Sequence, residues 1–140
     1  MSRLSFVRRI TLMYALLIVA VTVGSGLGFC RPLRALVNQY SNDKMMHFVL
    51  VGMLTLLLNL SMQLRTIGSL GNLFQRGTAI MLLVATCEEF SQAFIPARDF
   101  EWVDLASNYV GIVVMGSAAV LLAFVSREPA QKSSGPVQAL

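Results

Sequence analysis

The sequence predicts an all-α integral membrane protein, a bundle of four transmembrane helices with both chain termini on the inner side (N-in/C-in). Of its 140 residues, 56% are hydrophobic and only 13% are charged, about half of the roughly 25% charge typical of soluble domains. The mean hydropathy is +0.69. The charged residues lie mostly between long apolar runs. A membrane-crossing helix needs about 20 consecutive apolar residues, and several of these runs approach that length.

The first two predicted spans follow directly from these runs. Residues 10–30 contain no charged residue and are long enough to cross a bilayer. Residues 1–9, which carry three arginines, are expected to be a cytoplasmic N-terminus. The second span covers residues 45–64 and is bounded by Lys44 and Arg65.

The third span is the weakest of the four. Its charge-free part ends at Cys87, and it reaches full length, residues 77–95, only if the glutamates of "CEEFSQAFIPARDF" belong to the helix. Pro96 would then follow its end, since proline stops a helix. The fourth span, residues 104–126, has no charge after Asp104. The polar tail, residues 127–140, is expected to be disordered on the cytoplasmic side.

Loop charges give the orientation. With the N-terminus inside, the inner segments carry seven lysines and arginines and the outer segments carry four. This bias agrees with the positive-inside rule. A nucleic-acid partner is not expected, because no basic patch is interleaved with aromatic residues.

The polar residues of the spans gather at the outer side in this topology. Ionisable residues within spans usually face the interior of the bundle. The candidates are Asp43, Lys44 and His47; Glu89 and Gln92; Arg98; and Asp104 and Asn108. Residues three or four apart share a helix face, so the second, third and fourth spans each present one polar stripe. The sequence therefore predicts an outward-facing polar pocket at headgroup depth, with Arg98 paired to Glu89 or Asp104.

Other residues near these stripes have simpler interpretations. Trp102 is expected to be an interfacial anchor, and Asn108 could be a polar contact between helices. Gly111, on the stripe of Asp104, is small enough to let a neighbouring helix come close. Glu88 stays an open question, because only Glu89 is in register with the rest.

Two motifs carry a family resemblance. "DKMMHF" begins at Asp43, and "EFSQAFIPARDFEWVDLASNYVG" begins at Glu89; together they resemble the VanZ-like family of small bacterial membrane proteins. The matching residues are Asp43, Lys44, His47, Phe48, Glu89, Gln92, Phe94, Pro96, Arg98, Asp104, Asn108 and Gly111. Ala97 departs from the glycine frequent in the family before the arginine. The resemblance implies a VanZ-like domain over residues 10–126 and a multi-pass protein of the bacterial cytoplasmic (inner) membrane.

The resemblance also suggests a function. The founding member is linked to low-level resistance to the glycopeptide teicoplanin. The leading hypothesis is an envelope protein without a cofactor whose pocket binds the headgroup of an amphiphile, such as a lipid-linked precursor or a lipoglycopeptide. In it, Lys44, His47 and Arg98 would contact phosphate or carboxylate.

Two alternatives remain open. One is an intramembrane enzyme in which His47, Glu89 and Asp104 hold a metal ion or perform acid–base chemistry on a lipid-linked substrate. No nucleophile or metalloprotease motif supports it. The other alternative is structural: a buried polar network that specifies how the helices pack, with the function lying in partner proteins.

Overall fold

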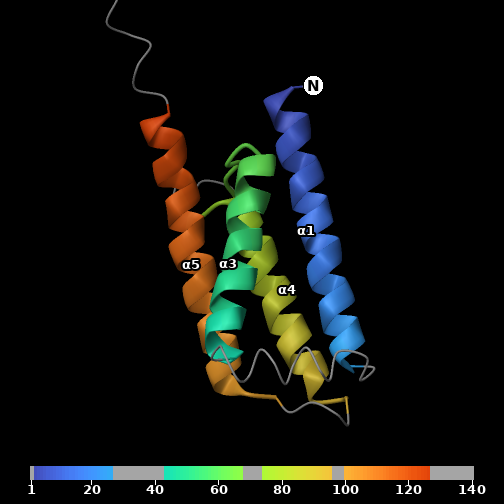
Figure 1. Ribbon diagram of the computed structural model, residues 1–140. Coiled ribbons are helices and arrows are strands. Elements are labelled where there is room, and N and C mark those ends of the chain that lie inside the picture. Colours follow the sequence, from blue (N-terminus) through green and yellow to red (C-terminus); the bar gives the residue numbers. More distant parts are fainter. Residues whose placement is uncertain (1, 27–42, 68–73, 96–99, 127–140) are drawn as a thin grey trace, which may run out of the picture.

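The computed structural model describes residues 2–26, 43–67, 74–95 and 100–126. These residues form four helices: α1 (Arg3–Gly26), α3 (Asp43–Ser61), α4 (Arg76–Gln92) and α5 (Trp102–Val125). Successive helices run in alternating directions (Figure 1). As a result, α3 and α5 begin at the same end of the bundle, which is also where α4 ends.

Three of the helices are long and apolar enough to cross a membrane, namely α1, α3 and α5. The expectation of an all-helical fold is thus confirmed for the described residues, and these three helices have the length and apolarity that a membrane span needs. Helix α4 has 17 residues and is about 26 Å long at 1.5 Å per residue, less than the roughly 30 Å of a hydrocarbon core. The short helix is the one in which the sequence places two glutamates.

Helix ends differ by a few residues from the predicted spans. Helix α1 begins at Arg3 because Ser2 caps it: the Ser2 Oγ accepts a hydrogen bond from the Ser5 N–H at 3.2 Å. The predicted cytoplasmic N-terminus is thus largely helical. Helix α3 ends at Ser61, before a turn in which Gln63 and Leu64 have φ values of 56° and 55°. Helix α4 ends at Gln92, three residues short of the predicted span. Residues 27–30 and 127–140 lie outside the described part.

Helix α3 occupies the centre and packs against the other three helices. Its contact with α5 is the closest, since a Cβ added at Gly52 would lie 2.9 Å from the Gly111 carbonyl oxygen and one added at Gly111 would collide with the Phe48 carbonyl. Small residues permit such close backbone approach in membranes. The apolar core beside this contact is centred on Met81, Ala85 and Ile112.

A neutral polar network joins α3 to the beginning of α4. Asn59, which is fully buried, donates from Nδ2 to Thr78 Oγ1 at 2.9 Å and accepts from the Thr78 N–H at 3.2 Å. The Thr78 hydroxyl donates in turn to Gln75 Oε1 at 3.3 Å. This Asn59 network (Asn59, Gln75 and Thr78) satisfies a backbone N–H that the start of a helix otherwise leaves unpaired.

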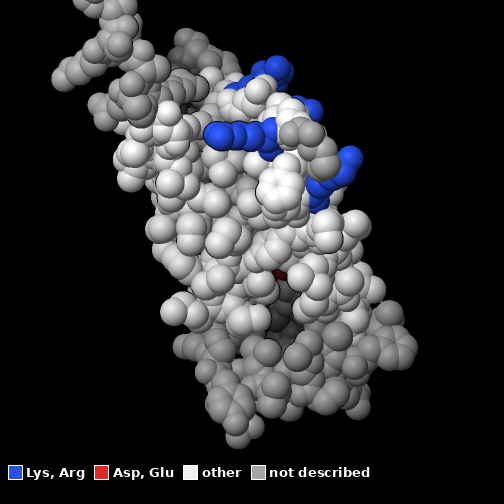
Figure 2. All heavy atoms as spheres, turned by 45° about the horizontal axis from the view of Figure 1, so that its top comes forward, with Lys and Arg blue, Asp and Glu red and all other residues white. Residues whose placement is uncertain are grey.

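Charge is segregated between the two ends of the bundle. The described arginines all lie toward the end where α1 begins, and Figure 2 shows basic side chains gathered there. We call this the arginine end; its arginines are Arg3, Arg8, Arg9, Arg65 and Arg76. The opposite end, where α3 and α5 begin, is called the acidic end. On the face shown in Figure 2, acidic atoms reach the surface only as a small spot within a hollow.

Candidate functional site

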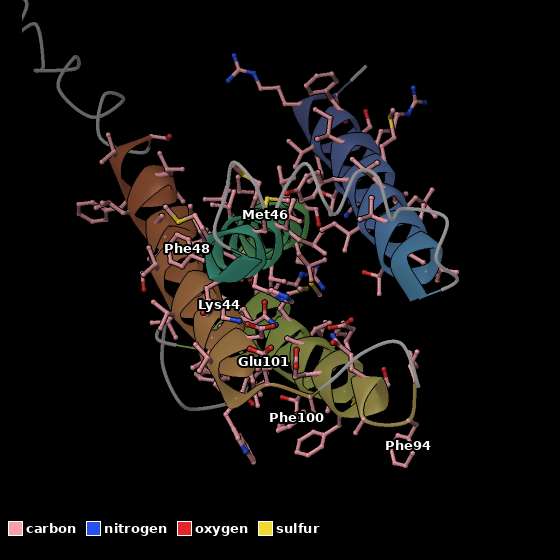
Figure 3. The ribbon with its side chains drawn as sticks, turned by 60° about the horizontal axis from the view of Figure 1, so that its bottom comes forward. Lys44, Met46, Phe48, Phe94, Phe100 and Glu101 are labelled. Carbon is pink, nitrogen blue, oxygen red and sulfur yellow. The ribbon has the colours of Figure 1, made fainter. Side chains whose placement is uncertain are left out.

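The acidic end brings together polar side chains from three helices and from the residues just before α5. Helix α3 contributes its first turns, α4 its last turn and α5 its first two turns. Figure 3 looks onto this end, with Lys44 and Glu101 pointing toward one another. We call the group the acidic-end cluster; its members are Lys44, His47, Glu88, Glu89, Gln92, Glu101, Asp104 and Asn108.

Lys44 lies between two carboxylates. Its Nζ is 2.7 Å from Glu101 Oε2 and 2.8 Å from Asp104 Oδ1. The pair with Glu101 is partly exposed, whereas the Asp104 side chain is only 8% exposed. Lys44 therefore joins the start of α3 to the start of α5 through two ion pairs. The pair with Asp104 is more buried than the pair with Glu101.

Glu101 was missed by the sequence reasoning. It lies before α5, with an extended backbone (φ −124°, ψ 119°), so helical spacing could not assign it to a stripe. A signal was present in "FEW", because one acidic residue alternates with two aromatic residues, and an extended segment points alternate side chains to opposite sides. Such an alternation indicates a segment with one polar and one apolar side.

The aromatic side of this segment packs on α4. The Phe100 ring stacks on Phe90 with centroids 5.1 Å apart, and Trp102 meets Phe100 edge-on at 4.7 Å. Phe90 and Trp102 nevertheless remain 48% and 67% exposed. We call Phe100, Glu101 and Trp102 the aromatic strap. It places the Glu101 carboxylate beside Lys44 while presenting rings outward, as a Trp-containing interfacial anchor would.

His47 links α3 to α5 beside Lys44. Its Nδ1 is 3.2 Å from Asn108 Oδ1, and its Nε2 is 3.6 Å from Asp104 Oδ2. Because the Asn108 oxygen only accepts hydrogen bonds, this geometry favours a proton on Nδ1. Asn108 is 1% exposed, so the imidazole is anchored by a side chain in the interior of the bundle. Its other nitrogen, Nε2, faces Asp104.

Glu89 is fully buried and is directed at the aromatic strap. Its Oε1 accepts a hydrogen bond from the Glu101 backbone N–H at 3.1 Å, and its Oε2 receives a long one from Gln92 Nε2 at 3.5 Å. Gln92 Nε2 also donates to Glu88 Oε1 at 3.0 Å. Glu88 is only half-buried, so the two adjacent glutamates occupy different environments.

The structure thus brings together most of the residues that the sequence singled out: Lys44, His47, Glu89, Gln92, Asp104 and Asn108. Gly111 lies one turn further along α5, at the close contact with α3. The side chain of Asp43 falls outside the described part, as do Pro96 and Arg98. The predicted ion pair of Arg98 is therefore not described, and Lys44 provides a cationic partner for Asp104.

The three side chains named in the metal-binding alternative, His47, Glu89 and Asp104, all belong to the acidic-end cluster. Among the described residues, no three His, Cys, Asp or Glu side chains are placed to share a metal ion. Of the three named side chains, His47 and Asp104 face one another, with Nε2 and Oδ2 3.6 Å apart, while Glu89 Oε1 accepts a hydrogen bond from the Glu101 N–H. The other Asp104 oxygen, Oδ1, lies 2.8 Å from the Lys44 ammonium, so this carboxylate already has a cationic partner.

Comparisons with known proteins add no identity: no family model, no curated protein and no solved structure matches this chain. The chemistry of the cluster consequently rests on its own side chains. It offers carboxylates, an ammonium, an imidazole and amides, a combination suited to binding a polar group by hydrogen bonds and ion pairs.

Proposed function

We propose that the protein is a multi-pass protein of the bacterial inner membrane, with four spans, both termini in the cytoplasm and the acidic end at the outer face. The segregated arginines support this orientation, because Lys and Arg accumulate on the cytoplasmic side of membrane proteins. The shorter α4 can serve as the fourth span, since its glutamates lie where the headgroup layer begins and a bilayer thins locally around a short helix.

Within this frame, the protein is a VanZ-like member of the cell envelope whose acidic-end cluster binds the headgroup of an amphiphile. The observation that carries the proposal is the convergence of charged side chains from α3, α4 and α5, with Glu89 fully buried and Asp104 nearly so. Buried ion pairs are weak evidence for stability, because desolvation offsets the attraction between the charges. Ionisable residues at membrane depth more often serve a function.

The structural alternative has a counterpart elsewhere in the molecule. The Asn59 network already joins α3 to α4 with neutral side chains, and the Gly52–Gly111 contact joins α3 to α5. The fold thus holds its central helices together by means that need no charge. This leaves ligand binding as the stronger reason for four carboxylates, a lysine and a histidine at one end.

Candidate ligands are a phospholipid, a lipid-linked envelope precursor or a glycopeptide with a lipid tail. The last of these would connect the cluster to teicoplanin tolerance. An acid–base enzyme acting on such a lipid is the second candidate function, favoured by the imidazole that faces Asp104 at 3.6 Å. Turnover of the bound lipid by the wild type, lost in His47→Ala, would favour the enzyme over the binding protein.

Photo-crosslinking tests the binding function. The purified full-length protein, reconstituted in vesicles, is labelled with phospholipid analogues that carry a diazirine in the headgroup. We expect labelling near the starts of α3 and α5, reduced about tenfold in the double variant Glu89→Gln, Asp104→Asn, since hydrogen bonds to charged groups contribute about 1.5–3 kcal/mol.

The control variant is Asn59→Ala, which disrupts a buried polar network of α3 and α4 at a distance from the cluster. It should label like the wild type in the folded fraction. Equal labelling of the wild type and the double variant would overturn the proposal.

A further inference from the structure

We infer that the acidic-end cluster recognises a primary ammonium group, bound between Glu101 and Asp104 in the place that the Lys44 Nζ takes in this structure. The inference rests on the proposed headgroup-binding function and names the chemistry that this site selects. It departs from the sequence-based expectation that Lys44 and His47 contact phosphate or carboxylate.

The charge balance at this end favours a cation. Within the described residues, four carboxylates accompany Lys44 and His47. An anionic headgroup would meet like charge here, whereas a cation would meet opposite charge in an environment of reduced dielectric.

Lys44 shows how an ammonium fits. Its Nζ lies within 2.8 Å of one oxygen from each of two carboxylates, Glu101 and Asp104. An ammonium has three N–H donors and no acceptor, so a partner pair of carboxylates suits it. The site is therefore built for this group, and in the structure the group comes from a side chain of the protein itself.

Asp104 forms the buried side of this site. Asp104 Oδ1 has the Lys44 ammonium at 2.8 Å, and no other described residue donates a hydrogen bond to it. Asp104 is 6% exposed, and buried polar atoms normally have a hydrogen-bond partner. The Lys44 ammonium supplies this partner, and an amine that displaced Lys44 would take over the same charge-assisted contact.

Lys44 can leave the site without a change in the helices. Its side chain is 32% exposed, and that of Glu101 is 51% exposed, so the ion pair borders the surface at the end of the bundle (Figure 3). The flexible four-carbon stem of lysine lets its ammonium move outward. An incoming amine then competes with Lys44 for Asp104 and Glu101. Because of this competition, the site binds an external amine only when the local concentration of that amine is high enough.

A binding series on the full-length protein in detergent tests this inference. The probes are phosphatidylethanolamine, its N-acetyl derivative, which has the same tails and phosphate but no ammonium, and soluble phosphoethanolamine. Native mass spectrometry measures the occupancy of the two lipids, and competition measures the soluble amine. We expect the wild type to prefer phosphatidylethanolamine over the N-acetyl lipid about tenfold, the size expected for one charge-assisted hydrogen bond.

The variants have distinct expectations. Asp104→Asn should abolish the preference. Lys44→Met, which removes the competing amine, should raise the affinity for phosphatidylethanolamine about tenfold and leave the N-acetyl lipid unchanged. If Lys44→Met does not accumulate, the half-exposed Glu101→Gln is the second variant, and it should lower the preference. Asn59→Ala, in the other polar network, should keep the preference of the wild type.

The outcomes separate the two proposals. Equal affinity for both lipids, with both reduced by Asp104→Asn, overturns the ammonium inference and leaves a headgroup site. If Asp104→Asn binds both lipids with the affinity of the wild type, the proposed function is overturned as well. Efficient competition by soluble phosphoethanolamine supports the ammonium inference and indicates that the bound amine comes from the aqueous phase. A preference for phosphatidylethanolamine over soluble phosphoethanolamine indicates instead that the bound ammonium belongs to a lipid headgroup.

Discussion

Glu88 and Glu89 show how much one position changes the surroundings of a side chain. Both belong to the last turns of α4, and the sequence offers only a register argument for preferring one. In the structure Glu89 is fully buried and accepts the Glu101 N–H, whereas Glu88 is half-buried beside Gln92. Glu89 thus stabilises the aromatic strap through the hydrogen bond from the Glu101 N–H. This is a structural role in addition to any contact with a ligand.

This difference predicts unequal variants. Glu89→Ala removes the acceptor of the Glu101 N–H and should lower the free energy of unfolding by about 1–3 kcal/mol, the cost of an unpaired buried polar group. Glu88→Ala should change it by less than about 1 kcal/mol. Unfolding of the purified protein in detergent, followed by circular dichroism, measures both. Equal losses would contradict the assignment.

Glu89→Gln separates structure from binding at the same position. Its amide oxygen can still accept the Glu101 N–H, so we expect stability near that of the wild type while headgroup labelling falls. If this variant were as unstable as Glu89→Ala, the negative charge itself would be needed for folding.

At the scale of elements, the contact between α3 and α5 sets the geometry of the site. Lys44 and His47 meet Asp104 and Asn108 only because the two helices approach closely one to two turns further along, at Gly52 and Gly111. The glycines hold the backbones near one another, and the polar side chains span the remaining distance at the ends.

Gly111→Ala tests this dependence. The added methyl group would collide with the Phe48 carbonyl, and such backbone contacts yield only by moving the helices apart. We expect a loss of about 1–3 kcal/mol in the free energy of unfolding, as for an overpacked core, and weaker headgroup labelling. The control is Ser117→Ala on the exposed side of α5, which should behave like the wild type; the same result for Gly111→Ala would show that the contact is not needed.

At the scale of the whole molecule, charge segregation and alternating helix direction give the bundle a polarity. The described arginines lie at one end and the described glutamates at the other. In the orientation that we propose from the positive-inside rule, the acidic-end cluster lies at the outer face, where a headgroup or an extracellular amphiphile would reach it.

Cysteine labelling tests this orientation and the number of spans. In a background with Cys30→Ser and Cys87→Ser, single cysteines replace Phe94, 87% exposed just after α4, and Ile67, 40% exposed between α3 and α4. A membrane-impermeant maleimide should label Phe94→Cys in intact cells and Ile67→Cys only after permeabilisation. Labelling of both in intact cells would show that α4 does not cross the membrane, and the reverse pattern would invert the orientation.

The sequence alone determined the helices and the grouping of polar residues. Long charge-free runs define helices of membrane length, and residues three or four apart must share a face because of the helical period. Because successive helices alternate in direction, α3 and α5 begin at the end of the bundle where α4 ends. These features depend on local periodicity and on chain order, both of which are read directly from the residues.

The tertiary structure decided which of these residues touch. It paired Lys44 with Asp104 and with Glu101, and it directed Glu89 Oε1 to the Glu101 N–H of the strap. The rotation and separation of neighbouring helices depend on side-chain packing, such as Gly111 against Phe48. Helical spacing carries no information about that packing, nor about an extended residue such as Glu101, whose partners come from other segments of the chain.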